Sequence, residues 1–192
     1  HPRENLRSSI IYRTNQLAAT ESFVISKIAA IAVKETIEEV TGKPALIKWP
    51  NDVYMDNKKA SGMLIENQWQ GNQLTTIIGI GINVNQTEFE NQPRATSCAL
   101  MSGKSHDVKL VLKTLTQNIE HYYNWIRAKK RIELDLLYKD NLLFFKETRT
   151  FKTQDETFRG KISNILNTGH LEITTIEDST RLFAFKEVEF VF

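Results

Sequence analysis

KWPNDVYMDNKKASG, from Lys48 to Gly62, is a dense polar segment that connects two apolar runs of the chain. ALIKW (45–49) overlaps its start, and GMLIEN (62–67) overlaps its end. The first run is too short and too apolar for a surface helix, so it predicts a buried strand. Pro50 ends that strand because proline lacks an N–H and has a fixed φ. The segment is therefore predicted to connect two strands of one sheet.

The charged residues of this segment predict a site for a phosphate-bearing ligand. Asn51 and Asp52 lie where the chain leaves the sheet, and Lys59 lies at the start of the next strand. A carboxylate can hold Mg²⁺, which binds one or two carboxylates and otherwise water or phosphate oxygens. A lysine beside it offsets charge when a carboxylate attacks a phosphate. The alternative is that Asn-Asp after proline is ordinary turn chemistry in a solvated loop.

A second cluster, GIGINVN, lies in an otherwise apolar strand. Gly79, Gly81 and Asn83 fall on one strand face because side chains alternate with period two. Two glycines leave that face bare, so a flat aromatic ligand can lie there, and the Asn83 amide can contact an adenine edge. The alternative is close packing of this face against a helix. A dinucleotide fingerprint is not supported, because the third glycine and the following helix are missing.

Composition sets the broad class of protein. The chain has 192 residues, of which 41% are hydrophobic and 25% charged, which is typical of a globular protein. A net charge of +2 gives no support to nucleic-acid binding. The single cysteine, Cys98, excludes an internal disulfide and fits a reducing compartment. No run reaches the roughly 20 apolar residues of a membrane span, so we expect a soluble, cytoplasmic protein.

Hydrophobic periodicity predicts the elements of a larger N-terminal domain over 1–146. The spacing predicts both strands and helices, with Thr20 as a helix cap and Gly71-Asn72 as a hairpin turn. Predicted strands cover 8–13, 45–49, 61–70 and 73–85, and predicted helices cover 20–41, 107–130 and 132–143. Residues 86–106 are predicted to be a loop with a short helical piece near 95–101.

The sequence changes character near residue 146. Four short alternating stretches follow, at 147–154, 157–165, 170–177 and 187–192, separated by polar turns. Short, evenly spaced strands are typical of a small all-β barrel. We therefore predict a second domain over 147–192.

The two clusters together resemble one family. KWPND, then KKASGMLIE, then a hairpin into GIGINVN resembles the catalytic domain of biotin protein ligases. The resemblance covers essentially the whole chain. It implies an α+β fold: a class II synthetase-like domain, whose mixed β-sheet has helices packed on one face, followed by a small SH3-like β-barrel.

The resemblance also implies an activity. Biotin's carboxylate attacks the α-phosphate of ATP to give biotinyl-5′-AMP, and a lysine of a carboxyl-carrier domain then takes the biotin. ATP, Mg²⁺ and biotin are the implied ligands. The implied roles are catalysis by Lys59 and Lys48, biotin binding by Lys59 and Gly62, ATP binding by Asn51, Asp52, Gly79, Gly81 and Asn83, and Mg²⁺ binding by Asp52.

One part of the family pattern is expected to precede the first strand. The family has an Arg- and Gly-rich loop of the GRGRxGR type there, and the sequence starts at His1, about where that loop ends. We therefore expect an N-terminally truncated chain. A winged-helix DNA-binding domain, which some members carry, would also lie upstream.

Two other functions and two uses of the sheet edge stay open. The chain is alternatively a lipoate or octanoate transfer enzyme of related fold, although KWPND argues against this. A further alternative is a non-catalytic module that binds biotin or a carrier domain. An exposed sheet edge suits either a carrier domain or a homodimer.

Overall fold

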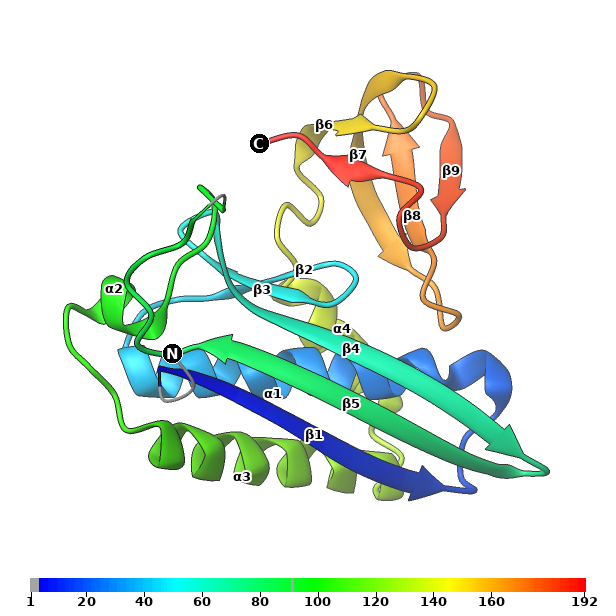
Figure 1. Cartoon of the computed structure of the whole chain (residues 1–192). Helices are drawn as coiled ribbons and strands as arrows, with labels where there is room; N and C mark the ends of the chain where they lie inside the picture. The colour runs from blue at the N-terminus through cyan, green and yellow to red at the C-terminus, as the bar shows by residue number, and fades with distance from the viewer. Residues whose placement is uncertain (1–3, 91) are drawn as a thin grey trace.

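The computed structural model describes residues 4–90 and 92–192 and contains two antiparallel sheets (Figure 1). In spatial order, the first sheet comprises β1 (Asn5–Thr14), β5 (Gln73–Asn83), β4 (Lys58–Gln70), β3 (Asp52–Met55) and β2 (Leu46–Lys48). The α+β class is confirmed. Every ladder between these strands is antiparallel. The described sheet is therefore antiparallel, whereas a mixed sheet was predicted.

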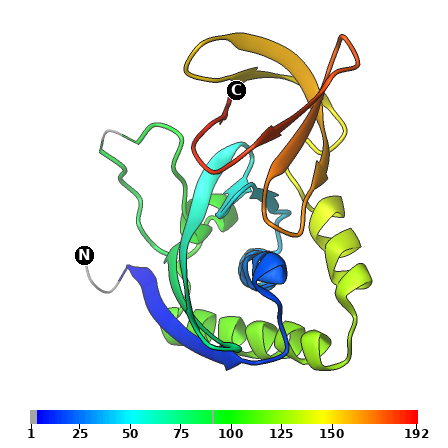
Figure 2. The ribbon, with the colours of Figure 1, turned by 90° about the vertical axis from the view of Figure 1, so that its right-hand side faces the viewer.

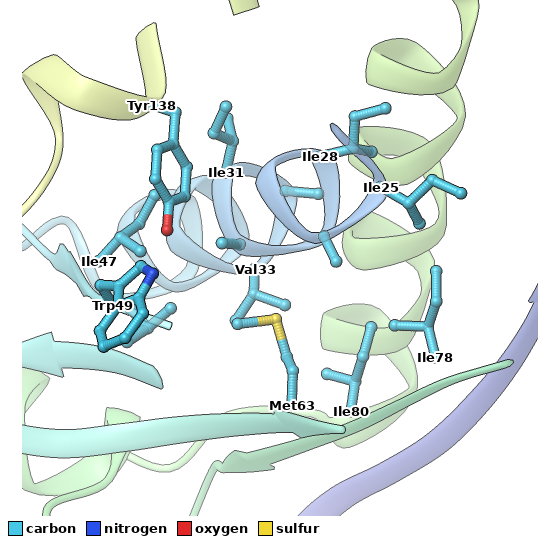
Figure 3. Packing of buried hydrophobic residues seen from close by; sticks show 14 of the residues in the cluster. Ile25, Ile28, Ile31, Val33, Ile47, Trp49, Met63, Ile78, Ile80 and Tyr138 are labelled. Carbon is cyan, nitrogen blue, oxygen red and sulfur yellow. The ribbon is translucent and has the colours of Figure 1, made fainter. Parts of the chain in front are cut away.

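Helices cover one face of the first sheet. α1 (Phe23–Thr41) and α3 (Val108–Arg127) lie against that face, whereas α2 (Cys98–Ser102) and α4 (Arg131–Asp140) pack against α1. A short 3-10 turn spans Ala19–Glu21. Figure 2 shows α1 and α3 on the same side of the curved sheet. The buried residues of α1 pack against Ile78, Ile80 and Met63, which project from that side of the sheet (Figure 3). None of the described helices is long and apolar enough to cross a bilayer.

Local capping chemistry sets the helix ends. The Asp107 carboxylate accepts a hydrogen bond from the Lys109 N–H at 2.8 Å and begins α3 as predicted. Gly42 ends α1 in the left-handed conformation, with φ of 67°. The N-cap of α1 is Ser22 and not the predicted Thr20.

Strand β3 lies inside the segment that the sequence assigned to a connection. It pairs with both β2 and β4, and Asp56 and Asn57 form the turn between β3 and β4, both with positive φ. Asn and Asp tolerate this conformation, which a two-residue hairpin turn requires. The strand was missed because its four residues are flanked by turn formers on both sides.

The second sheet is formed by the C-terminal part of the chain. In spatial order it comprises β10 (Glu189–Phe190), β6 (Thr148–Lys152), β7 (Thr157–Ile165), β8 (Leu171–Thr175) and β9 (Thr180–Phe183). The predicted all-β character is confirmed, and every ladder of this sheet is antiparallel. β9 was not predicted, because it is only four residues long. The domain boundary at 146 stays a prediction.

One turn of the second sheet docks on the first part of the protein. Gly169, between β7 and β8, accepts a hydrogen bond through its carbonyl from the Trp49 indole at 2.9 Å. Its α-carbon faces the ring of Phe23, the first residue of α1. The buried hydrophobic cluster continues from one sheet into the other. The turn therefore links the second sheet to Trp49, directly before the polar segment.

Candidate functional site

A β-bulge brings Lys59 onto the same face of the sheet as Asp52. Val53 is paired with Ser61 and Tyr54 with Lys59, so two residues of β3 lie opposite three of β4 and the register shifts by one. In a regular strand, positions 59 and 62 would lie on opposite faces. The extra residue of a bulge restores them to one face.

Lys59 and Asp52 form an ion pair directly above Gly62. The Lys59 Nζ lies 2.6 Å from Asp52 Oδ1, and the carboxylate side chain is only 17% exposed. A β-carbon added at Gly62 would lie 3.1 Å from Lys59 Nζ and 3.2 Å from Asp52 Oδ1. Glycine at this position therefore leaves room for the pair. The convergence of a lysine and a carboxylate, predicted from the sequence, is confirmed as geometry.

A groove of about 560 Å³ runs from this pair across the open face of the sheet. Its lining includes six residues that were assigned to the site from the sequence: Asn51, Asp52, Lys59, Gly62, Gly79 and Gly81. β-Carbons at Gly79 and Gly81 would have no contact closer than 3.7 Å. The alternate residues of β5 are buried on the helix side. The glycine face is therefore open and is not packed against a helix.

The two asparagines are held by hydrogen bonds to the backbone. The Asn83 side chain donates to the Thr96 carbonyl at 3.0 Å and lines a second cavity of about 370 Å³ beside the groove. The Asn51 side chain donates to the Met63 carbonyl at 2.5 Å. Asn51 thus ties the β2–β3 connection to β4 while it lines the groove.

Lys48 lies outside the groove that contains Lys59. Its ammonium group is 4.8 Å from the ring centroid of Phe190 and 5.7 Å from that of Tyr54. Burial lowers the pKa of Lys48, whereas the charge of Asp52 acts in the opposite direction. Lys48 lines a different cavity, between the two sheets. Lys48 is the cross-strand partner of Asp52, and within the described ranges it forms no ion pair with that carboxylate. Its catalytic role stays a prediction.

Arg7 is a site residue that the sequence analysis missed. It lines both the groove and the cavity that contains Asn83. The predicted strand began at Ser8, whereas β1 begins at Asn5. Alternation along NLRSSIIYR places Arg7 on the exposed face. The alternation could therefore have identified Arg7 as an exposed residue. Its pairing with Gly81 could not be predicted, because the register between two strands is not specified by either strand alone.

Asp52 is the one predicted metal ligand. No group of three or more His, Cys, Asp or Glu side chains that could hold a metal occurs within 4–90 and 92–192. A closed protein cage is therefore not formed by these residues. A single carboxylate fits Mg²⁺ that arrives with a nucleotide, because phosphates and water then supply the other ligands.

Cys98 is expected to be unreactive in the folded protein. Its side chain is fully buried, and burial raises the pKa of the thiol to about 11. Thiolate is the reactive form, so at pH 8 the thiolate fraction is about 100-fold lower than in an unfolded chain. We expect alkylation at pH 8 to be at least that much slower in buffer than in denaturant. Equal rates in the two conditions would contradict a buried thiol.

Sequence comparisons relate the chain to ligases. Residues 1–83 match the model of the biotin/lipoate A/B protein ligase family. The bifunctional ligase/repressor BirA of Bacillus subtilis is 32% identical over 165 residues, which is 83% of this chain and 51% of that protein. The biotin--[acetyl-CoA-carboxylase] ligase of Mycobacterium tuberculosis is 28% identical over 115 residues, 58% of this chain and 42% of that protein. The chain thus spans about half the length of the curated relatives it matches.

Solved structures extend the similarity to the whole described fold. Biotin protein ligase from Aquifex aeolicus has a TM-score of 0.78 at 28% identity, over 97% of this chain and 81% of that chain. Its complex with biotin and ATP has a TM-score of 0.77 at 27% identity, over 97% and 78%. A biotin protein ligase-like protein of unknown function from Silicibacter has a TM-score of 0.73 at 9% identity, over 93% and 77%, which shows the fold alone.

Proposed function

Because the chain belongs to the biotin protein ligase family, we propose that it provides the active site of an ATP-dependent biotin ligase. The observation that carries this proposal is the Lys59–Asp52 ion pair, which lies over a glycine floor at one end of an open groove. The proposed product of the first step is biotinyl-5′-AMP. In the second step, biotin is transferred to a specific lysine of a carboxyl-carrier protein.

The first step must bring two anions together. A carboxylate oxygen of biotin forms a bond to the α-phosphorus, and the bond from that phosphorus to the bridging oxygen breaks. Pyrophosphate leaves with the electron pair. The Lys59 ammonium group lies where it can offset the charge of both reactants, so electrostatics and positioning supply the rate. A side-chain nucleophile is not required.

We assign the predicted residues to two ends of the groove. Lys59 and Gly62 are proposed to contact biotin, with Lys59 also facing the phosphate. Asp52 is proposed to hold Mg²⁺, which neutralises triphosphate charge. The ATP contacts are proposed to come from Asn51, Asp52, Gly79, Gly81 and Asn83. The A. aeolicus structure with biotin and ATP supports this choice of ligands.

The proposed protein partner is a biotin carboxyl-carrier domain. In the described part of the sheet, β1 is one edge strand and β2 is the other. The outer edge of β2 is covered, because the Ile47 N–H donates to the Asn141 carbonyl and the Ile47 carbonyl accepts from the Leu143 N–H. An exposed strand edge can pair with another chain, so β1 suits a carrier domain or a second copy.

Pyrophosphate release and label transfer test this function. We expect the protein to release pyrophosphate when biotin, ATP and Mg²⁺ are all present, and to label a carrier lysine. Octanoate and lipoate in the same assay test the alternative substrates, since the matching family model includes lipoate ligases. Calorimetric binding of biotin without pyrophosphate release would instead support a non-catalytic module and refute the ligase proposal.

A further inference from the structure

Arg7 faces the glycine floor from the strand opposite the Lys59–Asp52 pair. In the β1–β5 ladder Arg7 is paired with Gly81, and in the β5–β4 ladder Gly81 is paired with Gly62. Gly62 is in turn paired with Asp52 of β3. Directly paired residues of antiparallel strands project to the same face. Arg7 and Asp52 therefore project from one row of four strands, with only glycines between them.

Arg7 lies where the groove meets the cavity that contains Asn83, and it also lines a third, larger cavity. The groove contains the Lys59–Asp52 pair, and the second cavity contains Asn83. Arg7, Gly62 and Gly81 line both. In an acyl adenylate, the phosphate joins the acyl group to the nucleoside. If the acyl group occupies the groove and the base lies near Asn83, the phosphate is at the junction.

Among the described residues, Arg7 is a cation of the site that forms no ion pair, although Glu4, Glu88 and Glu90 line a neighbouring cavity with it. Lys59 is already paired with Asp52 at 2.6 Å. Arg7 is exposed, and within the described ranges no ion pair or hydrogen bond of its side chain is found. An arginine is always charged, and its planar fork can bind two phosphate oxygens.

We propose that Arg7 contacts the α-phosphate of the biotinyl adenylate and of ATP as it reacts. This inference rests on the proposed function and adds a binding residue to it. The guanidinium neutralises the phosphate as the biotin carboxylate bonds to phosphorus and pyrophosphate leaves, and it exchanges no proton. A lysine would supply the charge without the two-point contact.

Arg13 is a matched control on the same strand. It is also an exposed arginine at an odd position of β1, so it projects from the same face. Arg13 is six positions after Arg7 in the sequence, which corresponds to about 20 Å along a strand. Arg13 lines neither the groove nor the Asn83 cavity. Arg7→Gln and Arg13→Gln therefore remove the same charge at two different places.

The test compares two probes by calorimetry on the full chain. One is biotin alone, and the other is a phosphodiester analogue of the adenylate in which a methylene replaces the acyl carbonyl. We expect Arg7→Gln to weaken analogue binding about 10- to 100-fold, as for a lost charged hydrogen bond, while biotin binding changes less than about threefold. Arg7→Lys should be intermediate, and Arg13→Gln should match the unmodified protein with both probes.

Three results would overturn the inference, and one of them also removes the function. Equal analogue affinity of Arg7→Gln and Arg13→Gln would show that Arg7 does not bind the phosphate. An equal loss for biotin and analogue would place Arg7 on the acyl group. Failure of the unmodified protein to bind either probe would refute the ligase proposal and this inference together.

Discussion

Replacing Lys59 with glutamine is expected to lower the rate of pyrophosphate release about 100- to 1,000-fold, the usual cost of removing one group that stabilises charge at a reacting centre. Lys59 Nζ is the cation of the ion pair over Gly62, at one end of the groove. Without it, Asp52 would repel both the biotin carboxylate and the triphosphate. Steady-state pyrophosphate release at saturating biotin and ATP measures the effect.

Lys58 is the matched control for this prediction. It is the adjacent residue of β4, is exposed, and lines neither the groove nor the Asn83 cavity. Lys58→Gln should therefore release pyrophosphate at the unmodified rate. The double variant Lys59→Gln/Asp52→Asn removes the unpaired carboxylate, so it should recover thermal stability but not activity. A Lys59→Gln rate within threefold of the unmodified protein would remove Lys59 from the site.

Gly169→Ala is expected to destabilise the protein by about 2–4 kcal/mol, since backbone strain and overpacking each cost about 1–3 kcal/mol. Gly169 has φ of 92°, and an added β-carbon would lie 2.7 Å from Phe23 Cδ2. Phe23 is buried at the start of α1 and packs edge to face on Tyr138, so its ring cannot move aside freely. For a chain of this size we expect Tm to fall by about 5–15 °C.

Gly42→Ala separates the two causes of this loss. Gly42 also has a positive φ, 67°, but no atom lies within 4 Å of an added β-carbon. Its substitution should cost only the backbone term, about 1–2 kcal/mol. Thermal melts followed by circular dichroism give both values. If the two variants melt at the same temperature, the contact between Gly169 and Phe23 does not anchor the second sheet.

Several features of the site could be predicted because they follow from one strand at a time. Alternation along GIGINVN placed Gly79, Gly81 and Asn83 on one face, and the structure confirms that this face is open. The strong apolar stripe from Asp107 onward predicted α3, and Gly71-Asn72 predicted the turn between β4 and β5. These signals are local, because side-chain period and turn chemistry act over a few residues.

The missed elements are those whose stability comes from their neighbours. β3 and β9 each have four residues and little periodicity of their own. β3 exists because β2 and β4 supply hydrogen bonds on both of its edges. Local propensity carries little information for strands this short, since cross-strand pairing supplies most of their stability.

The sequence by itself determined which residues are available: two lysines and a carboxylate between two strands, and a strand face left bare by glycines. The tertiary structure decided which of them meet. A bulge turned Lys59 to the face of Asp52, the β2–β3 register set Lys48 beside Asp52, and the β1–β5 register placed Arg7 opposite Gly81. Register and bulges depend on pairing between distant segments, so no single segment specifies them.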